Sequence, residues 1–131
     1  MKFATPCGSE TFEIPDDWWQ FCGMETWRRS SDYYPYSYTD ADVQNVEVVP
    51  VGEIEPPRRA TAVALLKKYK LVPVLLAFQS PECALPAIQV ERADQAGGPL
   101  YTVTNGFHRY FASIAVGYPC IPVRVYPRMP A

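Results

Sequence analysis

The chain holds one histidine, His108, which stands beside Arg109 in the stretch LYTVTNGFHRYFASIAVGYPCIPVRV, residues 100–125. A strand-like run ends at Asn105, and a helix-like run follows Gly106, whose backbone can adopt a bend that other residues resist. The first amides of a helix have no partner within it, and that end carries partial positive charge. A glycine and two basic side chains at such an end predict an anion site, with phosphate as the expected guest.

A structural role for the same residues stays open. Arg109 could pair with a nearby glutamate and His108 could cap a strand, and short motifs of glycine and basic residues often arise by chance. The two roles differ in what a substitution does. If Arg109 faces a cleft, its loss should weaken phosphate binding and leave the unliganded fold nearly unchanged. If Arg109 pairs internally, its loss should destabilise the fold itself.

Composition narrows the class of protein. The chain has 131 residues, of which 48% are hydrophobic and 20% charged, as expected for one globular domain. Its 14 prolines predict short elements with rigid connections. A net charge of −2 argues against a broad nucleic-acid surface and leaves only a local basic patch. We expect a cytoplasmic protein without membrane contact, because no apolar run approaches the roughly 18 residues of a membrane span and the N-terminus lacks a signal-peptide core.

The four cysteines predict neither a metal centre nor a disulfide framework. They are Cys7, Cys22, Cys83 and Cys120, and none belongs to a CxxC pair. A single histidine leaves few ligands for zinc. In a reducing compartment the expected state is four free thiols. The sequence assigns no catalytic residue and no metal ligand.

Residues 1–45 are expected to form an N-terminal elaboration packed on the core. KFAT and ETFEI are short strand candidates, and IPDDWWQFCGM predicts a short helix that stops at Gly23. From residue 27 to 42 the chain is rich in aromatic residues without a period, which predicts a loop. We expect this loop to cover a hydrophobic edge, with a surface for a protein partner as the alternative.

Residues 46–131 predict a compact α+β core. VEVVPV, LPAIQVERA, LYTVT and CIPVRVY are strand candidates, and QAGGPL is typical of a hairpin turn. Residues 60–70 have helical spacing. The apolar run LVPVLLAF, residues 71–78, is either a buried strand or a helix that continues past Pro73. Phe111, Ala112, Ala115 and Val116 fall on one face of the final helix.

Residues 101–125 resemble the segment that defines the ParB/sulfiredoxin superfamily. That segment has a strand, a glycine turn, a basic pair such as HR, an alanine-containing helix, and a glycine and a proline before a last strand. Upstream, VGEIEPPRR and LPAIQV resemble two other parts of the ParB N-terminal domain. The resemblance covers about residues 46–126, with a short insertion around residues 79–84. It implies a ParB/sulfiredoxin-like fold for residues 46–131.

The resemblance also implies a nucleotide site. In that superfamily the basic turn binds the phosphates of ATP or CTP, usually with Mg²⁺. It assigns phosphate contacts to Gly106, His108 and Arg109 and the turn to Asn105. It further places two arginines after the first strand in the same cleft; these are Arg58 and Arg59.

Two departures from the superfamily limit what the chain can do. Sulfiredoxins carry their catalytic cysteine immediately before the His-Arg pair, where this chain has Phe107. An apolar ring cannot act as a nucleophile, so sulfiredoxin chemistry is not expected. ParB segregation proteins continue into a helix-turn-helix and a dimerisation domain, and we expect neither in these 131 residues.

Three functions remain at this point. The favoured one is a nucleoside triphosphate-binding domain, with weak hydrolysis or phosphotransfer left open. The second is a ParB-like nuclease of plasmid or phage context, with DNA binding expected to be weak. A nuclease needs carboxylates to hold a metal, and the candidates, which have no diagnostic spacing, are Glu53, Glu55, Glu91 and Asp94. The third is a non-catalytic protein that binds a partner through its aromatic N-terminal loop.

Overall fold

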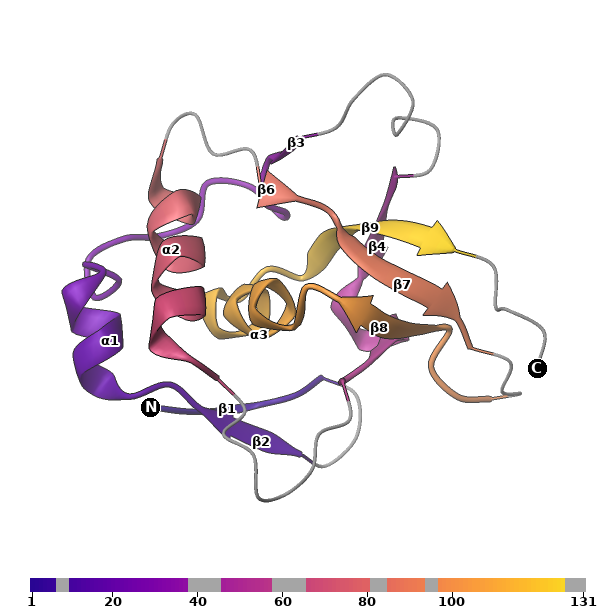
Figure 1. Cartoon of the computed structure of the whole chain (residues 1–131), viewed down its shortest axis with the longest axis horizontal. Helices are drawn as coiled ribbons and strands as arrows, with labels where there is room; N and C mark the ends of the chain where they lie inside the picture. The colour runs from indigo at the N-terminus through magenta and orange to yellow at the C-terminus, as the bar shows by residue number, and fades with distance from the viewer. Residues whose placement is uncertain (7–9, 38–45, 58–65, 81–84, 94–96, 127–131) are drawn as a thin grey trace.

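A computed structural model describes residues 1–6, 10–37, 46–57, 66–80, 85–93 and 97–126 of the chain. The architecture is α+β, as the sequence predicts: short strands and three helices built around one core. Figure 1 shows the sheet on one side of the molecule and helices α1 and α2 on the other, with α3 between them.

The main sheet has five strands in the order β4-β9-β7-β8-β5. These strands are β4 (Val46–Pro50), β5 (Ile54–Glu55), β7 (Ile88–Arg92), β8 (Tyr101–Asn105) and β9 (Cys120–Tyr126), and a 3₁₀ turn over Val51–Glu53 joins β4 to β5. β9 pairs antiparallel with β4 and parallel with β7, whereas β8 pairs antiparallel with β7 and parallel with β5. The predicted hairpin of β7 and β8 is therefore confirmed.

Helix α2 spans Lys68–Gln79 and contains Pro73. The apolar run that the sequence left undecided is thus helical. A proline inside a helix removes a backbone hydrogen bond and costs about 3 kcal/mol. Burial of five apolar side chains offsets that cost; they are Leu71, Val72, Val74, Leu75 and Phe78. The predicted helix over residues 60–70 is only partly tested, because residues 58–65 lie outside the described residues and Leu66 and Lys67 precede α2.

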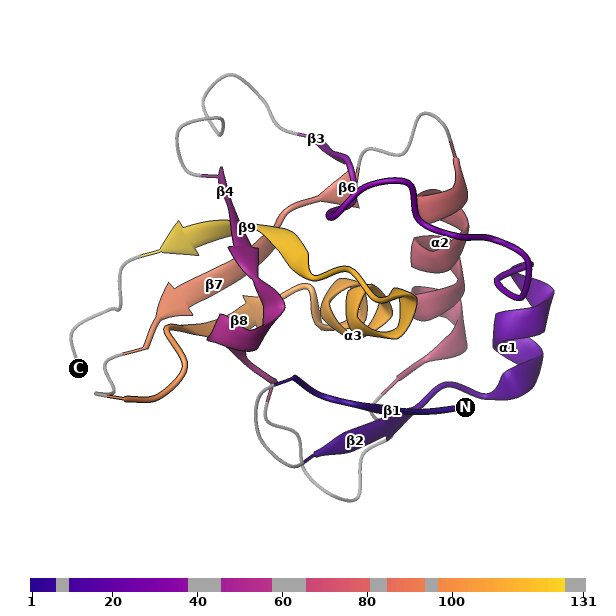
Figure 2. The same ribbon diagram turned by 180° about the vertical axis from the view of Figure 1, so that it is seen from behind.

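Helix α3 spans Phe107–Val116 and connects β8 to β9. It lies between α2 and the sheet, which Figures 1 and 2 show from opposite sides. Tyr110, Phe111, Ala112 and Ser113 are all buried in it. The sequence predicted a single apolar face, but a helix covered on two sides buries consecutive residues instead. The predicted Ala115 and Val116 are only half-buried.

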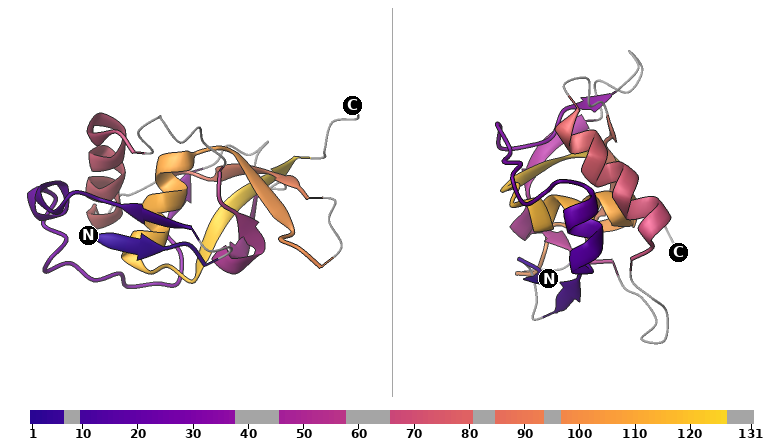
Figure 3. Two further views of the ribbon diagram at one scale, coloured as in Figure 1. Left: turned by 90° about the horizontal axis from the view of Figure 1, so that it is seen from below. Right: turned by 90° about the vertical axis from the view of Figure 1, so that its left-hand side faces the viewer.

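The N-terminal segment packs against the same core. Strands β1 (Lys2–Ala4) and β2 (Thr11–Glu13) form an antiparallel hairpin, and helix α1 (Asp16–Phe21) lies beside α2, as the two views in Figure 3 show. The Phe12 ring lies 4.9 Å from the Phe111 ring of α3, measured between centroids. Ile14 and Tyr34 have no exposed surface. The segment thus contributes buried side chains to one continuous apolar cluster.

The sequence predicted a loop over residues 27–42, but the structure contains a short strand within this range. β3 (Tyr36–Ser37) pairs in parallel with β6 (Leu85–Pro86) and forms a second, two-stranded sheet. Local sequence patterns could not predict this strand, because its partner strand lies some fifty residues further along the chain. Tyr34, two residues before β3, packs with a tilted ring against Phe78 and edge-on against Tyr118, so this part of the loop covers the core as expected. None of the described helices has the length and apolar character to span a bilayer.

Candidate functional site

The turn into α3 has the geometry that the sequence predicts. Gly106 has a φ of 100° and a ψ of 35°, a left-handed conformation that residues with a Cβ rarely adopt. The Tyr110 amide donates to the Gly106 carbonyl at 2.9 Å, which is the first backbone bond of the helix. The helix offers no acceptor to the amides that precede this bond. Positive potential is therefore concentrated at residues 107–109.

Arg109 is anchored to the neighbouring strand. Its Nη1 donates to the main-chain carbonyl oxygens of Pro86 and Ala87, the latter at 3.0 Å. The guanidinium also lies against Gly106: a Cβ built on that glycine would come within 3.0 Å of Arg109 Nη2. Burial lowers the pKa of the guanidinium, which the weaker influence of Tyr34 opposes. Arg109 thus links the turn to the region between β6 and β7, through carbonyl groups and not through a glutamate.

His108 links the start of α3 to the start of α2. Its Nε2 accepts a hydrogen bond of 3.0 Å from the backbone amide of Lys67, the residue before the first turn of α2. A ring nitrogen that accepts carries no proton, so the imidazole has Nδ1 as its donor. The sequence suggested a capping role for His108 on a strand. The structure shows the contact at a helix N-terminus instead.

A pocket of about 270 Å³ opens at this place. The turn residues Asn105, Gly106, His108 and Arg109 all line it, and so does Phe107. From α2 come two further lining residues, Lys70 and Val74. Four of the six residues that the sequence proposed for the site are therefore brought together.

The other two, Arg58 and Arg59, lie outside the described residues. Sequence reasoning did not find Lys70. Lys70 borders the pocket because α2 and α3 begin side by side, and its ammonium lies 5.8 Å from the centroid of the Tyr69 ring. The periodicity did not place α2. The available signal was the sequence KKYK at residues 67–70. We expected Lys67 and Lys68 to face water and Tyr69 or Lys70 to continue the helical spacing of Val63 and Leu66. Lys67 and Lys68 are exposed as expected, whereas Lys70 is exposed and borders the pocket.

The carboxylates and thiols of the described residues do not gather into a metal site. No group of three or more His, Cys, Asp and Glu side chains within the described ranges could hold a metal ion. Glu55 accepts a hydrogen bond from Thr102 across the sheet, and Asp94 lies outside the described residues. Cys22 is buried and Cys120 half-buried, both as free thiols. Cys7 and Cys83 fall in ranges that the structure does not describe.

Comparison with solved structures gives one distant match. The chain is similar to the C-terminally truncated chromosome-partitioning protein ParB from Caulobacter crescentus, solved in complex with CTP-γ-S. The two are 17% identical, with a TM-score of 0.48, over 64% of this chain and 45% of that one. The chain thus corresponds to less than half of that protein's length. No protein-family model matches the chain, and no curated protein matches it.

Proposed function

We propose that the pocket at the N-terminus of α3 binds the phosphate groups of a nucleoside triphosphate. The observation that carries the proposal is the position of Lys70, which borders the same pocket as the left-handed turn at Gly106. Backbone amides at a helix N-terminus and an ammonium group are two complementary ligands for phosphate. The proposal agrees with the resemblance of residues 101–125 to the ParB/sulfiredoxin superfamily.

Each residue has a distinct role in this proposal. Gly106 adopts the left-handed backbone that turns β8 into α3, and without a Cβ it leaves room for the Arg109 guanidinium. Asn105 ends β8 and sets the direction of the turn. Lys70 supplies charge, and His108 lines the pocket while its Nε2 holds the Lys67 amide. Arg109 is a positioning residue, since its Nη1 is bound to two carbonyl oxygens and holds the turn against the strands.

The volume of the pocket limits what it can hold. Whole small-molecule sites usually measure about 300–1,000 Å³, and this one measures about 270 Å³. It therefore suits the phosphates, with the ribose and base extending outside. We propose that Arg58 and Arg59, which the resemblance places in the same cleft, also contact the nucleotide.

Mg²⁺ fits this pocket only as a companion of the nucleotide. Among the described residues that line the pocket there is no carboxylate, and Asn105 offers one amide oxygen. Mg²⁺ usually keeps several waters and is bound through substrate phosphates with one or two carboxylates. We infer that phosphate oxygens and water hold the ion and that the chain contributes Asn105 at most. The residues support binding, and they assign no nucleophile or general base for turnover.

The test is a thermal-shift screen of ATP, CTP, GTP and ADP, each with and without Mg²⁺. A nucleotide at 100 times its dissociation constant stabilises the protein that binds it by about 2.7 kcal/mol. We expect a shift with at least one triphosphate and a much smaller shift for Lys70→Ala. Lys68→Ala is the matched control, because Lys68 lies over the Phe21 ring and does not border the pocket.

Two results would contradict the proposal. One is the lack of any shift with every triphosphate at millimolar concentration. The other is an equal loss of the shift in Lys68→Ala and Lys70→Ala, which would mean that the nucleotide responds to general charge and not to this pocket.

A further inference from the structure

A second, larger pocket lies at the other end of α3, on the N-terminal segment. Its volume is about 880 Å³, within the range of small-molecule sites. Trp19, Met24 and Trp27 contribute apolar surface to its wall, and Val116 contributes from the last turn of α3. The two pockets are separated by the length of that helix, roughly 14 Å at 1.5 Å per residue. The nucleotide proposal makes no use of this pocket.

The segment that forms the wall is held from behind by α2. The side-chain amide of Gln79 donates to the Cys22 carbonyl at 2.5 Å and lies 3.1 Å from the Met24 sulfur. The same nitrogen donates to the Leu75 carbonyl, one turn earlier in α2. This fixes the chain between α1 and Trp27 relative to the core. A wall that is already in place loses little entropy when a ligand binds.

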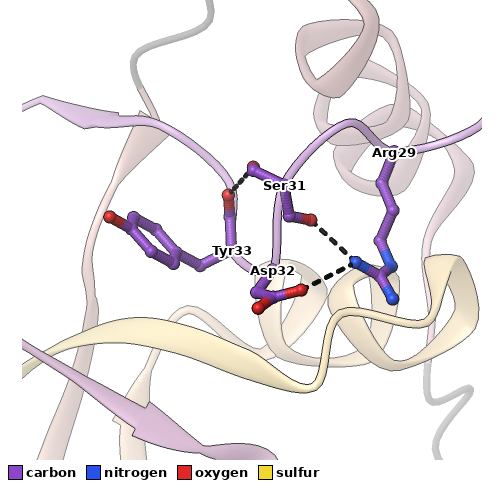
Figure 4. Close-up of polar contacts among 4 residues, drawn as sticks. All are labelled: Arg29, Ser31, Asp32 and Tyr33. Atoms are coloured by element: carbon purple, nitrogen blue, oxygen red, sulfur yellow. Dashed lines mark hydrogen bonds and ion pairs between the residues drawn. The ribbon is translucent and has the colours of Figure 1, made fainter.

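Two arginines on the rim are also held in place by their own loop. Arg28 Nη1 donates to the carbonyl oxygens of Glu25 and Trp27 at 3.2 and 2.8 Å. Arg29 Nη1 donates to the Ser31 carbonyl at 2.9 Å and to the Asp32 carboxylate at 3.3 Å, as Figure 4 shows. Both guanidinium groups are therefore oriented before any ligand arrives.

Among the charges on the rim, one guanidinium has no carboxylate partner within the described residues. Three cationic groups line the pocket, the Met1 amine, Arg28 and Arg29, against the carboxylates of Asp16 and Glu25. The Met1 amine is paired with Asp16 at 2.7 Å, and Arg29 has the Asp32 carboxylate as its partner. Among the described residues, Arg28 forms no ion pair, since both of its contacts are neutral carbonyls. Arg28 is therefore the group best placed to receive a single negative charge.

We propose that this pocket binds a small, flat aromatic carboxylate. The carboxylate meets the guanidinium of Arg28, whose Nε and Nη2 can donate two parallel hydrogen bonds to it while Nη1 stays bound to the Glu25 and Trp27 carbonyls. The ring lies against the indole surfaces of Trp19 and Trp27, which favour aromatic partners. A single charge matches the rim, whereas a triphosphate would face the carboxylates of Asp16 and Glu25.

The experiment uses the full chain and 2-naphthoate as the probe, followed by isothermal titration calorimetry. The neutral isostere 2-naphthamide and the cation 2-naphthylmethylamine are titrated in parallel. We expect saturable binding of 2-naphthoate and binding at least about tenfold weaker for Arg28→Gln, the loss of one charge-assisted hydrogen bond. Arg92→Gln is the matched control, since Arg92 is an exposed arginine at the end of β7 that does not line the pocket.

Three outcomes would overturn the inference. They are equal affinity for 2-naphthoate and 2-naphthamide, unchanged affinity in Arg28→Gln, and no saturation up to millimolar probe. The comparison of the three probes on the wild-type chain is decisive even if Arg28→Gln proves unstable. A titration of Lys70→Ala separates this inference from the nucleotide proposal, because 2-naphthoate should bind that variant as it binds the wild type.

Discussion

The two ends of helix α3 are built in different ways. At its N-terminus, four of the five consecutive residues 105–109 had been proposed from the sequence, and a lysine from α2 completes a small pocket. At its C-terminus, only Val116 belongs to α3, and residues from the N-terminal segment supply the rest of a pocket three times as large. The first site is local in sequence, and the second exists only after distant segments have packed together.

The difference predicts how each site responds to change. A local turn keeps its shape through a few backbone and side-chain contacts, so single substitutions in it should act at close range. A pocket assembled from distant segments depends on the packing that joins them. The contact between Phe12 and Phe111 is one such junction, and Gln79 is another.

The largest expected effect is at the contact between Phe12 and Phe111. Phe12→Ala should lower the free energy of unfolding by about 3–5 kcal/mol, because a buried aromatic ring is removed. Phe21→Ala is the control: its ring is 69% exposed, and the change should be within about 0.5 kcal/mol. Urea unfolding measures both. If Phe12→Ala leaves the main transition unchanged, the N-terminal segment is not part of the cooperative core and the comparison fails.

Gly106→Ala should have the next largest effect. The left-handed backbone at this position adds about 1–3 kcal/mol of strain for a residue with a Cβ. The new methyl group also meets the Arg109 guanidinium at 3.0–3.3 Å. Thermal or urea unfolding of the single variants and of the double variant with Arg109→Ala separates the two causes. The steric part should vanish in the double variant, and fully additive losses would show that the close contact has no energetic weight.

Arg109→Ala alone should destabilise the unliganded chain by about 1.5–3 kcal/mol, the range for hydrogen bonds to a charged group. The reason is that two carbonyl oxygens lose their cationic donor. This expectation follows the internal role that the sequence left open, and the measurement is the urea midpoint without ligand. An unchanged midpoint would instead mean that Arg109 contacts the ligand and does not stabilise the unliganded fold.

The smallest effect concerns Cys22. Burial raises the pKa of its thiol above the ordinary value of 9.0, against a weaker opposing influence of Lys68. A raised pKa means that the folded state favours the neutral thiol. Its contribution to stability is therefore present below pH 9 and is lost as the pH rises through the folded pKa. The difference in unfolding free energy between wild type and Cys22→Ala should shrink as the pH rises above about 9. A constant difference would show that the thiol titrates as in the unfolded chain.

The sequence predicted what depends on neighbours along the chain. The strands around residues 46–50, 88–92 and 101–105, the helix after Gly106 and its left-handed turn were all predicted from local patterns. The helical state of residues 71–78 could not be chosen, because Pro73 argues against a helix while tertiary burial of residues such as Leu71 and Leu75 favours it. The pairing of β3 with β6, the position of Lys70 and the second pocket all depend on contacts between distant residues.

The prolines at the edges of the five-stranded sheet affect how copies of the protein associate. β4 and β5 are the outermost strands of the five-stranded sheet. β4 ends at Pro50, and Pro56 and Pro57 follow the two residues of β5. A proline has no amide hydrogen to donate, and a short edge strand offers an incoming strand few backbone groups to pair with. At high concentration, edge-to-edge pairing between copies should therefore be disfavoured at both edge strands. Replacing Pro50 by a β-branched residue should lengthen the part of β4 that can pair with another copy.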